Sequence, residues 1–438
     1  MSELKRELGL RDLTLFAIAC IVGTRWIAAA AHAGPGSVAL WLVTAVFFVV
    51  PLTIAVASLS VRYPKAGGLY VWTRGDFGPW HGFLCAWVYW MGLAVWFPSA
   101  AMFYMQAALH TVGLPESRPW VLAAALGAIA VALGTNLIGM KVGKWTENLG
   151  GLSAWALTAI FCILAWLIWN HRGAATQMNF LPSWHWGTVN FWSTIAYGMS
   201  GIELAGLMAA EVRDPARTFP RVGWLAALGA TAFYASATIA LLVILPPERI
   251  SEMNGLSEAG DQAARVLSLV WLAPVIALLV TVSGMGQIGG IGAAISRLPF
   301  AAGADGLLPA AFARIHPRWH TPHFSILTLA AVSSFLLLAM QFGDTMRAAY
   351  QELVSLMIIA GFLPYLYIFG SSWRLGNRLS AVSGSTVVVL TIVCAVIPPA
   401  EITNVWLFEG KLALGTAAVI GSAWALYRQK AQAVPSST

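Results

Sequence analysis

An apolar run that begins near Leu13 and continues to Ala33 is interrupted by Cys20-Ile21-Val22-Gly23-Thr24-Arg25-Trp26-Ile27. An arginine at the centre of a membrane-spanning helix costs roughly 2.5 to 3.5 kcal/mol on insertion scales, so such a residue faces protein or water. Glycine beside it lets the backbone unwind, which hydrocarbon tolerates only where the freed amides and carbonyls line a cavity. The stretch therefore predicts a broken transmembrane helix whose break faces a polar chamber.

A second break of the same kind lies far downstream, in the stretch Gly198-Met199-Ser200-Gly201-Ile202-Glu203, and it carries an acid. Two glycine-interrupted helices in corresponding halves of a chain are the best sequence indication of a transporter's substrate site. We therefore predict that the two breaks face one shared chamber.

The composition is that of a membrane protein, because 59% of the 438 residues are hydrophobic and only 10% are charged. Soluble proteins carry about 25% charged residues. The net charge of +7 is spread over loops, so we expect no nucleic-acid partner. The four cysteines lie in apolar segments and do not suggest a disulfide framework. No cleavable signal peptide is evident at the charged start of the chain.

Twelve transmembrane helices are predicted, since the apolar segments match the roughly 20 residues that span a bilayer. An N-terminus in the cytoplasm places most loop lysines and arginines on the cytoplasmic side. We therefore predict an integral protein of the plasma or inner membrane with both termini cytoplasmic. The predicted spans are 13–33, 39–60, 82–110, 120–138, 146–170, 188–210, 219–245, 264–296, 323–342, 347–371, 382–398 and 410–427.

Helices 1–5 and 6–10 each begin with a broken helix, which predicts a 5+5 inverted repeat followed by two extra helices. An odd number of helices in each repeat forces the two repeats into opposite orientations. The expected fold class is thus an all-α polytopic membrane protein with a single transmembrane domain. Its predicted parts are a cytoplasmic segment 1–12, a domain 13–428 with repeats 13–172 and 188–373 and final helices 382–428, and a cytoplasmic tail 429–438.

Three loops carry recognisable motifs. They are Tyr63-Pro64-Lys65-Ala66-Gly67-Gly68-Leu69-Tyr70, then Glu211-Val212-Arg213-Asp214-Pro215 with Pro220, and finally Ser296-Arg297-Leu298-Pro299-Phe300 with Asp305-Gly306-Leu307-Leu308-Pro309 and Thr321-Pro322. In this order and between these helices, they resemble the amino acid–polyamine–organocation (APC) transporter superfamily. The resemblance extends from about Gly9 to Arg428. It implies a LeuT-type fold, alternating access and, most often, amino-acid substrates.

The resemblance also implies the site residues. Relatives usually have the pattern G-[ST]-G-I in the first break and offer its amides to a substrate carboxylate, as a helix N-terminus favours; here Arg25 replaces the second glycine. Tyr197 matches an aromatic gate, and Arg25, Glu203 and Tyr197 are the predicted gating or coupling residues. The predicted substrate-binding residues are Gly23, Thr24, Arg25, Trp26, Gly92, Leu93, Phe97, Tyr197, Ser200, Gly201, Ile202 and Ile291.

Two interpretations of Arg25 remain open. In one, it pairs with Glu203, so that neither charge is buried alone. In the other, it contacts the substrate directly, which favours an anionic or carboxylate-rich ligand. The remaining pocket residues are mostly apolar and suit a neutral, moderately apolar amino acid better than a polyamine.

The coupling mechanism also remains open. Some proton-coupled relatives carry a lysine in helix 5 where this chain has Ala154, while Thr281 and Ser283 offer hydroxyls to a sodium ion. Proton coupling through Glu203 and exchange against a second amino acid are further alternatives. His316, His320 and His323 share one loop, but no cysteine or carboxylate completes a zinc site, so neither metal nor cofactor is predicted.

The sequence thus predicts a secondary amino-acid transporter, a permease or exchanger, and not an enzyme. The alternatives within this class are an acid-resistance-type amino acid/amine antiporter and a polyamine or organocation carrier. A channel and a non-transporting membrane scaffold are the alternatives from other classes. The expected partners are the amino-acid substrate, H⁺ or a counter-transported amino acid, and the lipid bilayer, with the protein as a monomer or homodimer.

Overall fold

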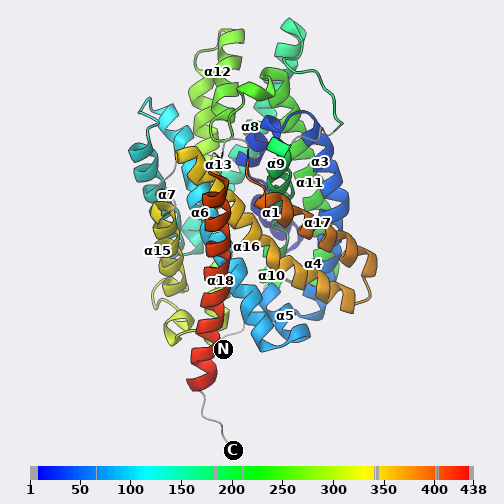
Figure 1. The fold of residues 1–438 in the computed structure, drawn as a ribbon, viewed down its shortest axis with the longest axis vertical. Coiled ribbons are helices and arrows are strands. Elements are labelled where there is room, and N and C mark those ends of the chain that lie inside the picture. Colours follow the sequence, from blue (N-terminus) through cyan, green and yellow to red (C-terminus); the bar gives the residue numbers. More distant parts are fainter. Residues whose placement is uncertain are drawn as a thin grey trace, which may run out of the picture.

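The computed structural model describes residues 8–65, 67–181, 186–209, 212–339, 341, 345–399, 402 and 404–433. The described chain is helical and contains no strand beyond an isolated bridge between Leu8 and Val212. The helices form one upright bundle, with α12 at one end and α5 and the C-terminal end of α18 at the other (Figure 1). The α-helices are α1 (Leu10–Ile21), α2 (Arg25–His32), α3 (Gly36–Thr44), α4 (Val50–Arg62), α5 (Leu69–Phe77), α6 (Pro79–Thr111), α7 (Arg118–Ile138), α8 (Met140–Arg172), α9 (Trp186–Gly198), α10 (Glu203–Leu207), α11 (Pro215–Ile244), α12 (Gly255–Leu267), α13 (Leu272–Ile295), α14 (Arg297–Ala304), α15 (His323–Ala339), α16 (Met346–Arg374), α17 (Arg378–Val396) and α18 (Val405–Ala433).

The membrane-spanning helices follow the predicted order. In the described ranges, eight helices are long and apolar enough to cross a membrane, and α1 with α2 forms a further span that is bent by 46°. The shorter α15, the broken pair α9 and α10, and the less apolar α18 occupy the other predicted spans. The prediction of an all-helical polytopic membrane fold is therefore confirmed.

One predicted span was wrong at its start. The segment 264–296 does not form one helix, because α12 ends at Leu267 and α13 begins only at Leu272. Ser268 adopts a left-handed conformation with φ 56° and ends α12, and a short turn then changes the chain direction. Apolar composition continues through this turn, so the sequence pattern did not reveal it.

The loop after α4 is packed against the second broken helix. Gly68 has φ 44°, and a Cβ at this position would lie 3.0 Å from the backbone nitrogen of Leu207 in α10. Only glycine combines this conformation with so close an approach. The paired glycines of the Tyr-Pro motif therefore let this loop contact the helix that follows the second break.

The short helix α5 is connected to the segment after α14 by a polar contact. The Tyr70 hydroxyl donates to Asp305 Oδ2 over 2.6 Å, and Arg74 forms an ion pair with the same carboxylate. Burial raises the pKa of Tyr70 and the hydrogen bond to Asp305 raises it further, so the phenol stays protonated and donates. Two of the three sequence motifs thus meet at the end of the bundle where α5 lies (Figure 1).

Substitution of Gly150 tests the close contact between α8 and α13. A Cβ at Gly150 would lie 2.6 Å from the Cα of Gly286, so we expect Gly150→Ala to destabilise the protein by about 1 to 3 kcal/mol through overpacking. Gly151 is the matched control, because its Cβ would meet nothing within 4 Å. Gly151→Ala should leave thermal stability in detergent unchanged or raise it by up to about 1 kcal/mol. Equal melting temperatures for the two variants would contradict the observed packing.

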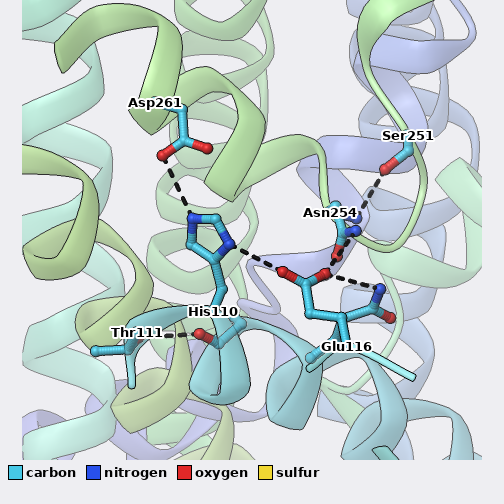
Figure 2. A network of polar contacts seen from close by, with 8 residues as sticks. His110, Thr111, Glu116, Ser251, Asn254 and Asp261 are labelled. Carbon is cyan, nitrogen blue, oxygen red and sulfur yellow. Dashed lines mark hydrogen bonds and ion pairs between the residues drawn. The ribbon is translucent and has the colours of Figure 1, made fainter. Parts of the chain in front are cut away.

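A polar cluster attaches α12 to the end of α6 (Figure 2). His110 is the centre of the cluster: its Nδ1 lies 2.9 Å from Glu116 Oε1, and its Nε2 lies 3.3 Å from Asp261 Oδ1 on α12. Asn254 Nδ2 donates to the second oxygen of Glu116 over 3.1 Å. Since both ring nitrogens face carboxylate oxygens, only the doubly protonated imidazolium can donate to both.

We expect His110→Ala to increase amide hydrogen exchange in residues 255–267 by roughly ten-fold, because it loses the partly exposed ion pair to Asp261 of α12 and the one that holds Glu116 beside Asn254. Wild-type protection of α12, corrected for intrinsic exchange, should also be greater at pH 5 than at pH 8, and this difference should vanish in the variant. Thr111→Ala is the control, since among the described residues its hydroxyl bonds only to Ala107 O of the same helix. Unchanged exchange of α12 in His110→Ala would show that the cluster does not hold it.

Candidate functional site

The first break separates α1 from α2, and side chains of two other helices form hydrogen bonds with its backbone groups. The Tyr234 hydroxyl donates to Ile21 O over 2.7 Å and accepts from Gly23 N over 2.8 Å. Gln287 Nε2 donates to Val22 O over 3.0 Å. The polar backbone groups that the unwound segment exposes are thus satisfied by side chains from α11 and α13, as a break within a bilayer requires.

The second break separates α9 from α10 and contacts the first. Gly201 has φ 122°, and a Cβ there would lie 3.1 Å from Cys20 O. A Cβ at Gly198 would lie 3.0 Å from the indole of Trp26. The glycines therefore do two things: they permit the irregular backbone, and they let the two breaks pack directly against each other.

A small chamber of about 20 Å³ lies between the breaks, enough space for about one water molecule. Seven of the predicted site residues line it, together with nine that were not among the predicted site residues. The predicted ones are Trp26, Leu93, Tyr197, Ser200, Gly201, Glu203 and Ile291, and the others are Cys20, Ile21, Tyr89, Trp96, Gly198, Leu204, Gln287, Gly361 and Tyr365.

The other predicted residues lie around the chamber without lining it. Thr24 Oγ1 is 3.1 Å from Ser283 Oγ, and Gly23 packs on Trp26 and Gln287. Gly92 packs against the backbone of Gly361, and the Phe97 ring lies edge-on to Trp96. Ile202 is buried directly before α10.

Arg25 is fully buried and is not paired with Glu203. Its Nη1 donates to Ser99 Oγ over 2.8 Å, and its Nη2 lies 3.4 Å from Met357 Sδ. The guanidinium carbon is 3.8 Å from the Trp26 ring centre, a cation–π contact. Within the described ranges, Arg25 forms no ion pair and its Nε has no hydrogen-bond partner. The interpretation that Arg25 pairs with Glu203 is therefore wrong for this conformation, because other groups lie closer to each charge.

Glu203 lies at the other break with partners of its own. Its Oε1 accepts from the Tyr89 hydroxyl, and its Oε2 accepts from Gly201 N over 3.0 Å. Because both oxygens accept, the contacts suit an ionised carboxylate. The site thus contains a buried guanidinium and a buried carboxyl group, each hydrogen-bonded to neutral groups and not to the other.

Three polar residues of the chamber were not among the predicted site residues, although the sequence carried a signal for them. Tyr89, Gln287 and Tyr365 are polar side chains within apolar spans, where such groups are expensive and usually functional. Gln287 is also the partner of the first break and of the Tyr104 hydroxyl, at 2.9 Å. Sequence position alone did not show that these residues from different helices converge.

Thr281, Ser283 and His316 make local contacts. Thr281 Oγ1 donates to Ala277 O, and Ser283 Oγ donates to Val280 O. The His316 ring stacks on Trp319 at 4.3 Å. In the part of the chain that the structure describes, no group of three or more His, Cys, Asp or Glu residues is arranged to hold a metal ion.

Comparison with known proteins defines the class of this transporter-like site. Residues 8–406 match the amino acid permease family. The chain is 24% identical to an uncharacterised transporter of Legionella pneumophila over 93% of this chain and 94% of the relative. It is 26% identical to the serine/threonine exchanger SteT of Bacillus subtilis (76% of this chain, 77% of the relative). It is 25% identical to the low-affinity putrescine importer PlaP of Escherichia coli (68% and 65%).

The fold and the facing breaks define a membrane transporter of small molecules. The chain belongs to the amino acid permease family, since the match covers most of its length. The prediction of an APC superfamily member is thereby confirmed.

Proposed function

We propose that this protein is a secondary active carrier of an α-amino acid that works by alternating access in the bacterial plasma membrane, with both termini cytoplasmic. The observation that carries the proposal is the direct contact between two broken helices around a chamber that is flanked by Arg25 and Glu203. The SteT exchanger among the relatives supports an amino-acid substrate.

The separated charges favour a zwitterion. A bound α-amino acid has a carboxylate for the break that carries Arg25 and an ammonium for the break that carries Glu203. It therefore supplies an opposite charge to each buried group, which neither has among the described residues. A polyamine has no carboxylate and would bring more positive charge near Arg25. For this reason we favour an amino acid over the organocation alternative, although PlaP is a putrescine importer.

The lining favours a neutral, moderately apolar side chain. Leu93, Leu204 and Ile291 provide aliphatic surface, and Trp26 and Tyr197 provide aromatic surface with ring centres 5.8 Å apart. Apolar walls with a few placed polar groups are typical of small-molecule sites. Tyr89, Ser200, Gln287 and Tyr365 supply the polar part of the same lining, so a hydroxyl on an otherwise neutral side chain would also find partners there.

Substrate binding requires the chamber to expand. At about 20 Å³, it is too small for an amino acid, and Trp26 fills the space between the two breaks. We propose that the helices of the breaks, with α3, α4 and α11, rock against the remaining bundle, and that α2 tilts within this moving group and carries Trp26 away from Gly198. The half-helices α2 and α10 are short enough to tilt as units.

Counterflow in proteoliposomes tests this function. Purified protein should show saturable uptake of a labelled amino acid that accelerates when the same amino acid is present on the far side. Linear uptake without acceleration would indicate a channel. Absence of both uptake and thermal stabilisation across the twenty amino acids would contradict a carrier of these substrates and favour a scaffold. Uptake of putrescine but of no amino acid would support the organocation alternative.

A further inference from the structure

A second, larger cavity lies on the lipid-facing side of the bundle, between α6, α16 and α18 near the end of α5. Its volume is about 400 Å³, and almost its whole lining is apolar. Leu366 and Ile420 at its edges are 36% and 41% exposed, so it opens to the exterior of the bundle. We call it the α6–α16–α18 groove, lined by Phe77, Leu84, Cys85, Val88, Leu363, Pro364, Leu366, Tyr367, Gly370 and Ile420.

The groove lies directly behind a wall of the substrate chamber. Gly361 and Tyr365 of α16 line the chamber, whereas Leu363, Pro364 and Tyr367 of the same turns line the groove. α6 and α16 touch backbone to backbone at Gly361, where a Cβ on Gly92 would lie 2.8 Å from the Gly361 nitrogen. One turn further along α16, the space between the helices is not filled by protein.

The end of the groove near α5 is polar and basic. The Arg374 guanidinium carbon is 4.5 Å from the centre of the Phe77 ring, which lines the groove. Arg374 follows Tyr367 and Gly370 on one face of α16 and donates to the backbone oxygen of Asp76. His81 Nδ1 lies 2.9 Å from the Tyr367 hydroxyl. Arg374 is exposed and forms no ion pair with any described residue.

We propose that the α6–α16–α18 groove binds a phospholipid with an anionic headgroup, with an acyl chain along its apolar lining and the phosphate beside Arg374. The apolar lining disfavours a polar ligand, because the lining residues offer few polar groups to compensate its desolvation. The basic residue stands where α16 ends, at the depth at which lipid phosphates meet arginine side chains. Charge complementarity at this end selects an anionic over a zwitterionic lipid.

Lipid binding to the purified, delipidated full chain tests the proposal. Native mass spectrometry would compare phosphatidylglycerol with phosphatidylcholine of the same acyl chains, and we expect about a five-fold preference for phosphatidylglycerol, as one arginine near a headgroup provides. Arg374→Gln should remove this preference. The matched control is Arg378→Gln, an exposed arginine that stacks on Trp373 outside the groove and should keep it.

A second part of the experiment fills the groove with a larger side chain. Ile420→Trp should reduce binding of both lipids, whereas Leu414→Trp, at an exposed position of α18 outside the groove, should bind as wild type does. Leu366→Trp serves the same purpose from the α16 side if Ile420→Trp does not fold. Equal binding of the two lipids by wild type, an unchanged preference in Arg374→Gln, or undiminished binding in the folded tryptophan variants would each overturn the proposal. None of these results bears on whether the protein carries amino acids.

Discussion

Replacement of Arg25 by methionine is expected to abolish substrate-induced thermal stabilisation and to lower kcat/KM of uptake by about 10- to 150-fold. A hydrogen bond from a charged group contributes about 1.5 to 3 kcal/mol, and this contact would be lost from the bound state. The substrate-free protein should remain at least as stable as wild type. In wild type, the buried guanidinium of Arg25 has neutral partners and an unpaired Nε. Methionine, an apolar side chain of similar length, therefore removes a desolvated charge.

The opposite directions of these two effects distinguish a binding residue from a structural one. Removal of one partner from a buried ion pair costs about 3 to 5 kcal/mol, so a loss of that size in the substrate-free protein would show that Arg25 has a structural anion. Arg25→Lys should recover part of the uptake, because it keeps the charge without the planar fork of donors. Arg221→Met, at an exposed arginine of α11, is the control and should behave as wild type in both assays.

Glu203→Gln is expected to reduce uptake strongly while stability changes by less than about 1 kcal/mol. The amide oxygen can accept from Gly201 N, and the amide nitrogen can donate to the Tyr89 hydroxyl, so both hydrogen bonds survive and only the charge is lost. The partner of the substrate ammonium would therefore be weakened. Glu203→Leu should in addition cost about 1 to 3 kcal/mol, because the Gly201 amide is left buried without an acceptor.

Uptake and thermal unfolding of both Glu203 variants check this expectation. Glu258→Gln, at an acid on α12 outside the chamber, is the control. Wild-type uptake by Glu203→Gln would show that transport does not use the charge. An imposed pH gradient provides a further measurement: if it accelerates the uptake of wild type but leaves the residual uptake of Glu203→Gln at its rate without a gradient, the carboxylate carries the coupling proton.

The two breaks were predictable from sequence because each combines glycine with a charged residue inside an apolar run. Gly23 with Arg25, and Gly201 with Glu203, conflict with an unbroken helix in hydrocarbon. In the structure, one helix ends at Ile21 and the next begins at Arg25, and a second interruption separates Gly198 from Glu203. The turn at Ser268 had no comparable signal, because the residues around it have ordinary propensities and an apolar neighbourhood.

The partners of Arg25 were not predictable in the same way. The sequence suggested Glu203 as its partner, because this acid lies in the second break as Arg25 lies in the first. In the structure, Ser99 of α6 and Met357 of α16 contact the guanidinium instead. Trp26, one of the predicted substrate-binding residues, fills the space between the two breaks. Both outcomes depend on how far each half-helix is rotated about its axis, and composition does not encode this rotation.

The sequence by itself determined where the chain crosses the membrane and where two crossings break. In a bilayer the backbone amides of a regular span are satisfied within its own helix, so apolar length and local interruptions decide these features residue by residue. Only the tertiary structure decided which polar side chains meet. Tyr234 reaches the first break and Gln287 joins it from more than 200 positions away, and such contacts depend on helix packing that no local pattern carries.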